Sequence, residues 1–215
     1  MLLISVAGRG ALATQLSKPR VLNVDNIAVY AKEHLKVELL RVGTSSNKWE
    51  FELLVRNEGE YAIFLMTEPV KTDGSVGPYV ALAGDDQSTL EISSMVYALP
   101  PYTIYSDYSS VKLKYLSPHA QYRMPFTISN VMSESIPPYK DFPVAREISL
   151  YKVRFVRAFV GVLPDDEGIR DFLRRKEAIG PFTNGLEQIE RGQYKGKRII
   201  DLQVVITSQS IGLNN

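Results

Sequence analysis

KWEFELLVRNEGEYAIFLM, at residues 48–66, decides the fold class that this sequence predicts. Apolar residues occupy every second position on both sides of a short polar break, at Trp49, Phe51, Leu53, Val55, Tyr61, Ile63 and Leu65. A period of two is typical of a β-strand with one buried face. The break, Asn57-Glu58-Gly59-Glu60, contains two residue types that tolerate positive φ, so we expect two strands joined as a hairpin.

Strand patterns continue along the rest of the chain. LKVELLRV (35–42) and VKLKYL (111–116) alternate, and EISLYKVRFVRAFVGVL (147–163) is the longest candidate. Its second half is apolar on both sides except at Arg157, which predicts a central strand with either a surface arginine or a paired interior charge. RIIDLQVVITS (198–208) is rich in β-branched residues, and we expect it to pair with that strand.

One helix is predicted, between the last two strands. Pro164-Asp165-Asp166-Glu167 places acidic residues at a helix start, and Gly180-Pro181 ends the pattern. The sequence therefore predicts an all-β antiparallel sandwich over residues 35–215 with a helical insertion at 164–193, preceded by an N-terminal arm or strand at 1–34.

A second local pattern joins two strands, Leu116-Ser117-Pro118-His119-Ala120-Gln121-Tyr122. It resembles the corner between the fifth and sixth strands of immunoglobulin-like and fibronectin type III domains. The resemblance implies that the Tyr122 hydroxyl bonds upstream backbone and that Met124, Phe126 and Ile128 face inward. Pro125 departs from the family pattern and predicts an edge or a bulge.

Composition excludes several classes of function. Lys and Arg number 25 against 24 Asp and Glu, so no broad field attracts nucleic acid or an anionic membrane. Cysteine is absent, which excludes disulfides, cysteine nucleophiles and thiolate metal sites. No apolar run reaches the roughly 18 residues of a transmembrane helix. An exported bacterial protein of this size can do without disulfides, and we favour an extracytoplasmic location.

The N-terminus has two interpretations. MLLISVAG is apolar, and Ala11-Leu12-Ala13 has the small-x-small pattern of a signal cleavage site. No basic residue precedes the apolar run, which is also short for a secretion signal. We favour a folded arm over a signal remnant.

Patterns for catalysis, metals and cofactors are missing. The two histidines, His34 and His119, lie in different contexts, and no Gly-x-Ser-x-Gly elbow is present. The acidic turns at residues 73–75 and 84–87 lack the calcium-loop pattern. We therefore expect no enzyme activity, no metal and no cofactor.

Two features are candidates for binding. Basic residues crowd the predicted helix, at Arg170, Arg174, Arg175 and Lys176, and could meet an acidic partner or form a solvated helix face. Tyr105 and Tyr108 belong to a tyrosine-rich stretch typical of protein or glycan contacts.

These observations predict a non-enzymatic binding or assembly module with a protein partner, associated with the cell envelope. One alternative is a glycan-binding or carbohydrate-active domain. Another is a structural subunit in which an arm at residues 1–20 exchanges between protomers. The sequence leaves a homo-oligomer open.

Overall fold

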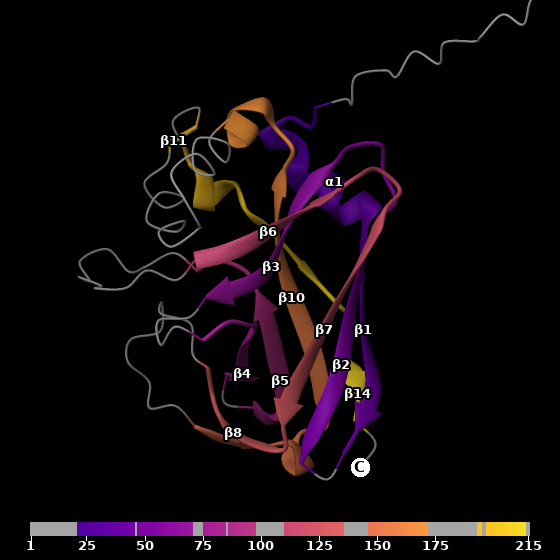
Figure 1. The fold of residues 1–215 in the computed structure, drawn as a ribbon, viewed down its shortest axis with the longest axis vertical. Helices are drawn as coiled ribbons and strands as arrows, with labels where there is room; N and C mark the ends of the chain where they lie inside the picture. The colour runs from indigo at the N-terminus through magenta and orange to yellow at the C-terminus, as the bar shows by residue number, and fades with distance from the viewer. Residues whose placement is uncertain are drawn as a thin grey trace, which may run out of the picture.

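The computed structural model describes residues 21–45, 47–70, 75–84, 86–97, 110–135, 146–171, 193–194 and 197–213, and they are mainly β-strand (Figure 1). The elements are η1 (Val24–Asn26), α1 (Ile27–His34), β1 (Leu35–Thr44), β2 (Lys48–Asn57), β3 (Ile63–Val70), β4 (Tyr79–Ala83), β5 (Asp86–Ser94), β6 (Ser110–Leu116), β7 (Gln121–Ser129), β8 (Val131–Ser133), β9 (Glu147–Ser149), η2 (Leu150–Lys152), β10 (Phe155–Pro164), β11 (Gln193–Tyr194), β12 (Lys197–Arg198), η3 (Ile199–Leu202), β13 (Val204–Thr207) and β14 (Ile211–Gly212). The prediction of a β-rich fold is confirmed.

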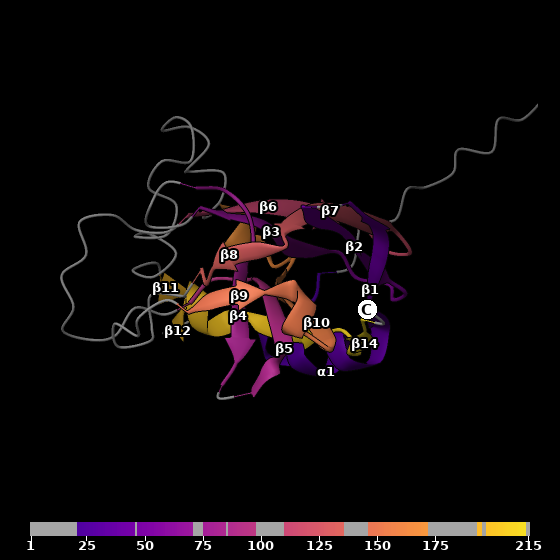
Figure 2. The same ribbon diagram turned by 90° about the horizontal axis from the view of Figure 1, so that it is seen from below.

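Two sheets form the body of the protein. A small antiparallel sheet has the strand order β1-β2-β7. A large sheet has the order β4-β5-β10-β3-β6, with β13 and β14 also paired to β10. Seen from below, β1, β2 and β7 lie in a layer above β4, β5 and β10 (Figure 2).

The large sheet is organised by β10, the strand that the sequence predicts to be central. β13 pairs with it, which confirms the predicted pairing of the C-terminal run with this strand. β5 pairs with β10 in parallel, however, so the prediction of a purely antiparallel sandwich is wrong. The chain between β5 and β10 passes through the small sheet and returns, and a connection of that length permits a parallel pair.

The core lies between the two layers. Trp49 is 3% exposed and Phe51 is fully buried, as the alternation of β2 predicts. The rings of Trp49 and Phe51 stack with centroids 6.4 Å apart, and Phe51 stacks on Phe126 of β7 at 5.7 Å. Because apolar burial is the main favourable term in folding, the face of β2 that carries Trp49 and Phe51 anchors the small sheet.

The predicted hairpin at residues 48–66 is wrong, because β2 and β3 do not pair. β2 pairs with β1 and β7 in the small sheet, whereas β3 pairs with β10 and β6 in the large sheet. Neither Asn57 nor Gly59 is among the described residues with positive φ. The polar break is thus an arch that carries the chain from one layer to the other.

A second arch crosses beside the first one. It leads from β6 to β7 through residues 117–120, where His119 has a φ of 55°. The Asn57 N–H donates to the Ala120 carbonyl at 2.9 Å and so ties the two arches together. The two layers are therefore connected twice at the same end of the two sheets.

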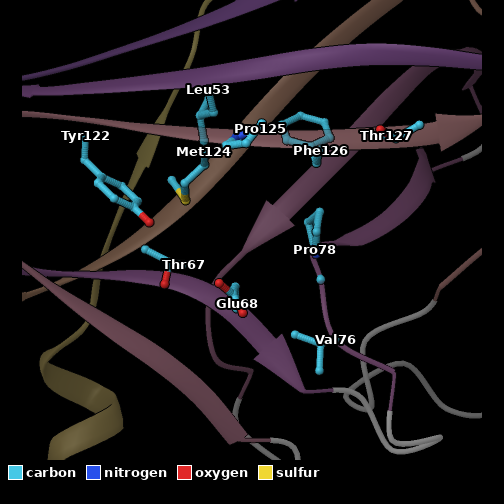
Figure 3. Close-up of a pocket in the computed structure, with 11 residues that line it drawn as sticks. Leu53, Thr67, Glu68, Val76, Pro78, Tyr122, Met124, Pro125, Phe126 and Thr127 are labelled. Atoms are coloured by element: carbon cyan, nitrogen blue, oxygen red, sulfur yellow. The ribbon is translucent and has the colours of Figure 1, made fainter.

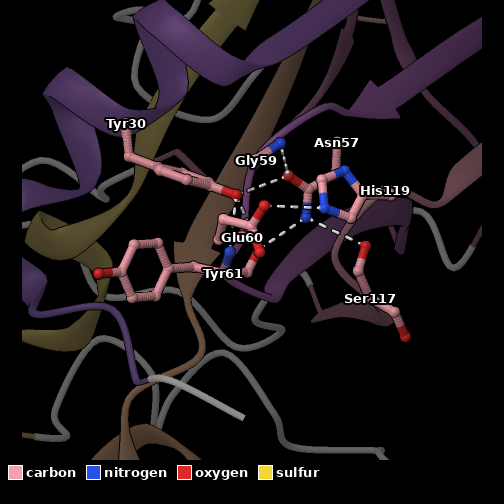
Figure 4. A network of polar contacts seen from close by, with 7 residues as sticks. All are labelled: Tyr30, Asn57, Gly59, Glu60, Tyr61, Ser117 and His119. Atoms are coloured by element: carbon pink, nitrogen blue, oxygen red, sulfur yellow. Dashed lines mark hydrogen bonds and ion pairs between the residues drawn. The ribbon is translucent and has the colours of Figure 1, made fainter.

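The buried side chain of Asn57 joins both arches to α1 (Figure 4). Its Nδ2 donates to the carbonyls of Tyr61 at 2.7 Å and Ser117 at 3.1 Å. Its Oδ1 lies 2.7 Å from the Tyr30 hydroxyl and accepts from the Gly59 N–H at 3.3 Å. The Tyr30 hydroxyl also accepts from the Tyr61 N–H at 3.1 Å, so a tyrosine of α1 locks the crossing.

Tyr122 does not have the role that the immunoglobulin-like resemblance implies. Its hydroxyl makes no hydrogen bond to any residue that the structure describes, and Lys114 Nζ lies 5.5 Å from its ring centroid. Met124 and Ile128 are buried, as expected, while Phe126 is half-buried. The resemblance to that family stays a prediction.

The segment before β1 is helical, and the C-terminal part differs from the prediction. Leu22 and three residues of α1 belong to the main core cluster, while residues 1–20 of the predicted arm lie outside the described residues. Only residues 208–210 separate the last two strands, β13 and β14, so no helix is inserted there. Helical residues 167–171 instead follow β10, and 172–192 are outside the described part of the chain.

Gly59 packs so closely against Tyr30 that we expect Gly59→Ala to destabilise the protein. A Cβ at this position would lie 2.6 Å from Tyr30 Cε2 and 2.7 Å from Cζ, and hydrogen bonds prevent that ring from moving. The expected loss is about 1–3 kcal/mol of unfolding free energy, measured by urea denaturation. Gly212→Ala is the control, since its added Cβ would meet no atom within 4 Å. Equal stability of the two variants would contradict the prediction.

Candidate functional site

A groove of about 410 Å³ opens between β7 and the end of β3 (Figure 3). We call it the β7 groove, and its lining residues are Leu53, Thr67, Glu68, Val76, Gly77, Pro78, Tyr122, Met124, Pro125, Phe126 and Thr127. β7 provides one wall, and β3 with the segment leading into β4 provides the other. The groove exists because no strand of the described chain follows β7 in the small sheet.

The lining of the β7 groove presents nearly as much polar as apolar surface, and it carries little free charge. Glu68 is its only carboxylate, and it pairs with Lys112 of β6. Thr67 Oγ1 donates to the Lys112 carbonyl at 3.1 Å. The Tyr122 hydroxyl is directed into the groove, toward Thr67 (Figure 3). This surface suits a neutral ligand that combines apolar groups with hydrogen-bond acceptors.

The pairing of β7 with β2 shows which residues of β7 direct their backbone N–H and C=O groups toward the free edge. Two backbone hydrogen bonds beyond its ends, Asn57 N–H to Ala120 O and Asn130 N–H to Asn47 O, set the alternation. Residues in antiparallel pairs alternate between hydrogen-bonded and non-hydrogen-bonded positions. The even-numbered residues of β7 therefore direct their backbone groups toward β2, and the odd-numbered ones direct theirs away from it.

Pro125 is one of the outward-directed residues, at the middle of the free edge. Its side chain is exposed, and its pairing partner is Glu52 of β2. Because proline has no N–H, the edge lacks a donor at its centre. Proline at such a position hinders the addition of another strand. The predicted edge at Pro125 is confirmed, and this edge is partly blocked.

The corresponding edge of the large sheet, β4, is closed by Glu134, Ser135 and Arg146. Glu134 is 8% exposed, and its Oε1 accepts from the Leu82 N–H at 2.8 Å. Arg146 Nη2 donates to the Leu82 carbonyl at 3.0 Å and to Glu134 Oε1 at 2.8 Å. Ser135 N–H donates to the Val80 carbonyl at 2.8 Å. β4 is thus not available to a partner strand.

Of the residues that the sequence singles out for binding, only Arg170 is described. It forms a two-pronged ion pair with Asp165, whose side chain is 1% exposed. The hydrogen bond to Asp165 raises the pKa of Arg170. Burial, followed by the Asp165 charge, raises the pKa of Tyr115, whose hydroxyl lies 3.3 Å from Asp165 Oδ2. Arg170 therefore makes an internal contact.

The other candidate residues are scattered or undescribed. Arg174, Arg175, Tyr105 and Tyr108 lie outside the described residues. Arg157 pairs with Glu91 on the face of the large sheet, with Nε 3.0 Å from Oε1. Arg157, the one charged residue of β10, is thus neutralised by an ion pair with Glu91.

The histidines do not form a metal site with the described acids. His119 Nε2 lies 3.1 Å from Glu60 Oε1 at the tip of the arches, and His34 lies 3.8 Å from Glu33. Among the described residues, no group of three or more His, Cys, Asp or Glu could hold a metal ion. His119 and Glu60 form an exposed pair that bridges the two arches.

Sequence patterns point to one wall of the β7 groove only. The alternation of β7 and its proline indicated an edge with inward apolar residues. Val76 and Pro78 lie in a turn-rich segment without periodicity, so no local signal places them opposite β7.

Comparisons with known proteins give no family. No family model matches this chain, no curated protein matches it, and no solved structure matches it. No helix of the described residues is long and apolar enough to cross a membrane. Function is therefore inferred from the geometry of the β7 groove.

Proposed function

We propose that this protein is a non-enzymatic binding module that takes an extended, apolar segment of another protein in the β7 groove. The carrying observation is a groove of about 410 Å³ that combines apolar side chains with a few hydrogen-bonding groups, placed at an edge of the small sheet that no described strand covers. Ligand sites of about 300–1,000 Å³ with few polar groups are typical of specific binding pockets. The cell-envelope setting remains part of this proposal.

The lining favours a protein segment over a glycan. Cleavage of a glycosidic bond uses two facing carboxyl groups, and the groove contains only Glu68, already paired with Lys112. Val76 and Pro125 supply exposed apolar surface to the groove, and the hydroxyl groups of a sugar would not complement it. Apolar side chains of an extended peptide gain free energy from the same burial.

The proposal predicts that Val76→Arg strongly weakens peptide binding. Val76 is 55% exposed, so the substitution adds bulk and charge to the groove wall without opening the core. Peptides selected from a random displayed library on the wild-type protein should bind Val76→Arg at least tenfold more weakly, because the change removes apolar contact and introduces an unpaired charge. Binding is measured by fluorescence anisotropy of labelled peptides.

Val42→Arg is the matched control. Val42 is 59% exposed and lies on β1, the opposite edge of the small sheet. It should bind the selected peptides as the wild type does. Failure to select any peptide, or equal losses in both variants, would refute the β7 groove as the binding site.

A further inference from the structure

We infer that the segment bound in the β7 groove is a proline-containing stretch in the polyproline II conformation. The inference rests on the proposed function and specifies its ligand. It follows from the free edge of β7, from the shape of the lining and from the donors that face the groove.

The free edge of β7 is unsuited to a β-strand ligand. A strand added beside β7 would pair with the outward backbone groups of Arg123, Pro125 and Thr127. Pro125 cannot donate, so the added strand would leave a carbonyl unpaired at its centre. A polyproline II segment has no ladder hydrogen bonds to satisfy, so the missing donor does not count against it.

The lining provides surfaces for flat, rigid rings. Tyr122 and Phe126 project from β7, and on the opposite wall Pro78 faces Phe126 while Thr67 faces Tyr122 (Figure 3). Phe126 stacks on buried Phe51, which fixes the ring from below. Proline-rich segments dock into aromatic-lined grooves because they are already ordered and lose little entropy on binding.

The hydrogen-bonding groups of the groove also match a proline segment. The Tyr122 hydroxyl points into the groove and has no hydrogen-bond partner among the described residues. Thr127 lines the same wall with an exposed side chain. Proline residues offer carbonyl acceptors and no N–H donors, so hydroxyl donors complement them. Tyr122 is then the residue that recognises a ligand carbonyl.

The inference is tested with two labelled synthetic peptides of equal length on the full-length chain. One is decaproline, and the other alternates threonine and valine so that it favours a strand. We expect decaproline to bind and the threonine–valine peptide to bind more weakly. Tyr122→Phe should weaken decaproline binding roughly three- to tenfold, the loss of one hydrogen bond. Its unfolding midpoint should not change, since the hydroxyl bonds no described residue.

Pro125→Thr restores the missing donor and serves as the second variant. It should gain affinity for the threonine–valine peptide. Tighter binding of that peptide than of decaproline by the wild-type protein would overturn the inference and leave the proposed function standing, provided that Val76→Arg still blocks binding. Unchanged decaproline binding in Tyr122→Phe, or in Val76→Arg, would overturn the inference as well. If the random library also gives no ligand, the proposed function falls with it.

Discussion

Replacing Arg146 with methionine is expected to lower the free energy of unfolding by about 3–5 kcal/mol at pH 7. The side chain of Glu134 is only 3% exposed, and Arg146 is its sole ion-pair partner among the described residues. Methionine keeps much of the side-chain volume and removes the positive charge, so the buried Glu134 carboxylate keeps two backbone N–H donors but loses its counter-charge. Urea denaturation followed by circular dichroism measures the loss.

The expected loss is large because Arg146 serves several groups at once. Its Nε and Nη2 donate to the two oxygens of Glu134 at 3.0 and 2.8 Å. It also donates to the carbonyls of Leu82 and Gly84, at 3.0 and 2.8 Å. The variant therefore weakens the closure of the β4 edge in addition to breaking an ion pair.

The same pair predicts a definite pH dependence. Burial raises the pKa of Glu134, but hydrogen bonds from Arg146 and from the Leu82 N–H outweigh burial, and the net pKa is lowered. A carboxyl group whose pKa is lower in the folded state stabilises the protein above its unfolded pKa, about 4.3. That contribution is lost as the pH falls through the folded pKa. The stability difference between wild type and Glu134→Gln should therefore shrink in acid.

The double variant Arg146→Met with Glu134→Leu is the control. It removes the charge together with its partner, so it should recover much of the stability lost in Arg146→Met. In the single variant the pKa of Glu134 loses the lowering effect of the Arg146 side chain and should rise, so protonation should relieve part of the defect at low pH. A single variant within about 1 kcal/mol of the wild type, or a double variant less stable than the single one, would contradict this account.

The individual strands could be predicted because their signal is local. Trp49 and Phe51 alternate with polar residues, and alternation is all that a strand with one buried face requires. Pro125 likewise indicated an edge by the chemistry of one residue. Such features depend on neighbours in sequence, so they can be predicted without knowledge of the fold.

The path between strands was not predictable, because it depends on distant residues. A hairpin and an arch can share the same polar break, and residues 57–60 contain nothing that separates them. The arch at residues 57–60 is stabilised by Tyr30, which belongs to α1, and by Ser117, which belongs to the second arch. The second wall of the β7 groove escapes prediction for the same reason, since Val76 and Pro78 have no periodic pattern.

Asn57→Ala is expected to destabilise the protein by about 3 kcal/mol or more. The substitution removes Nδ2, which donates to both arches, together with the acceptor Oδ1. Asn57 is 1% exposed and contacts four polar groups, those of Tyr30, Gly59, Tyr61 and Ser117. A buried polar group left without a partner costs about 1–3 kcal/mol, and alanine leaves more than one such group. The measurement is the free energy of unfolding in urea.

Coupling to Tyr30 shows whether the arches are locked as one unit. Tyr30→Phe removes only the hydroxyl, which Asn57 Oδ1 and the Tyr61 N–H both contact. If that hydroxyl acts through Asn57, the double variant should be less destabilised than the sum of the two single variants, by about 0.5–3 kcal/mol. Asn47→Ala is the matched control, because Asn47 is exposed and should change stability by less than about 0.5 kcal/mol. Additive effects of Tyr30→Phe and Asn57→Ala would mean that the helix and the arches are held independently.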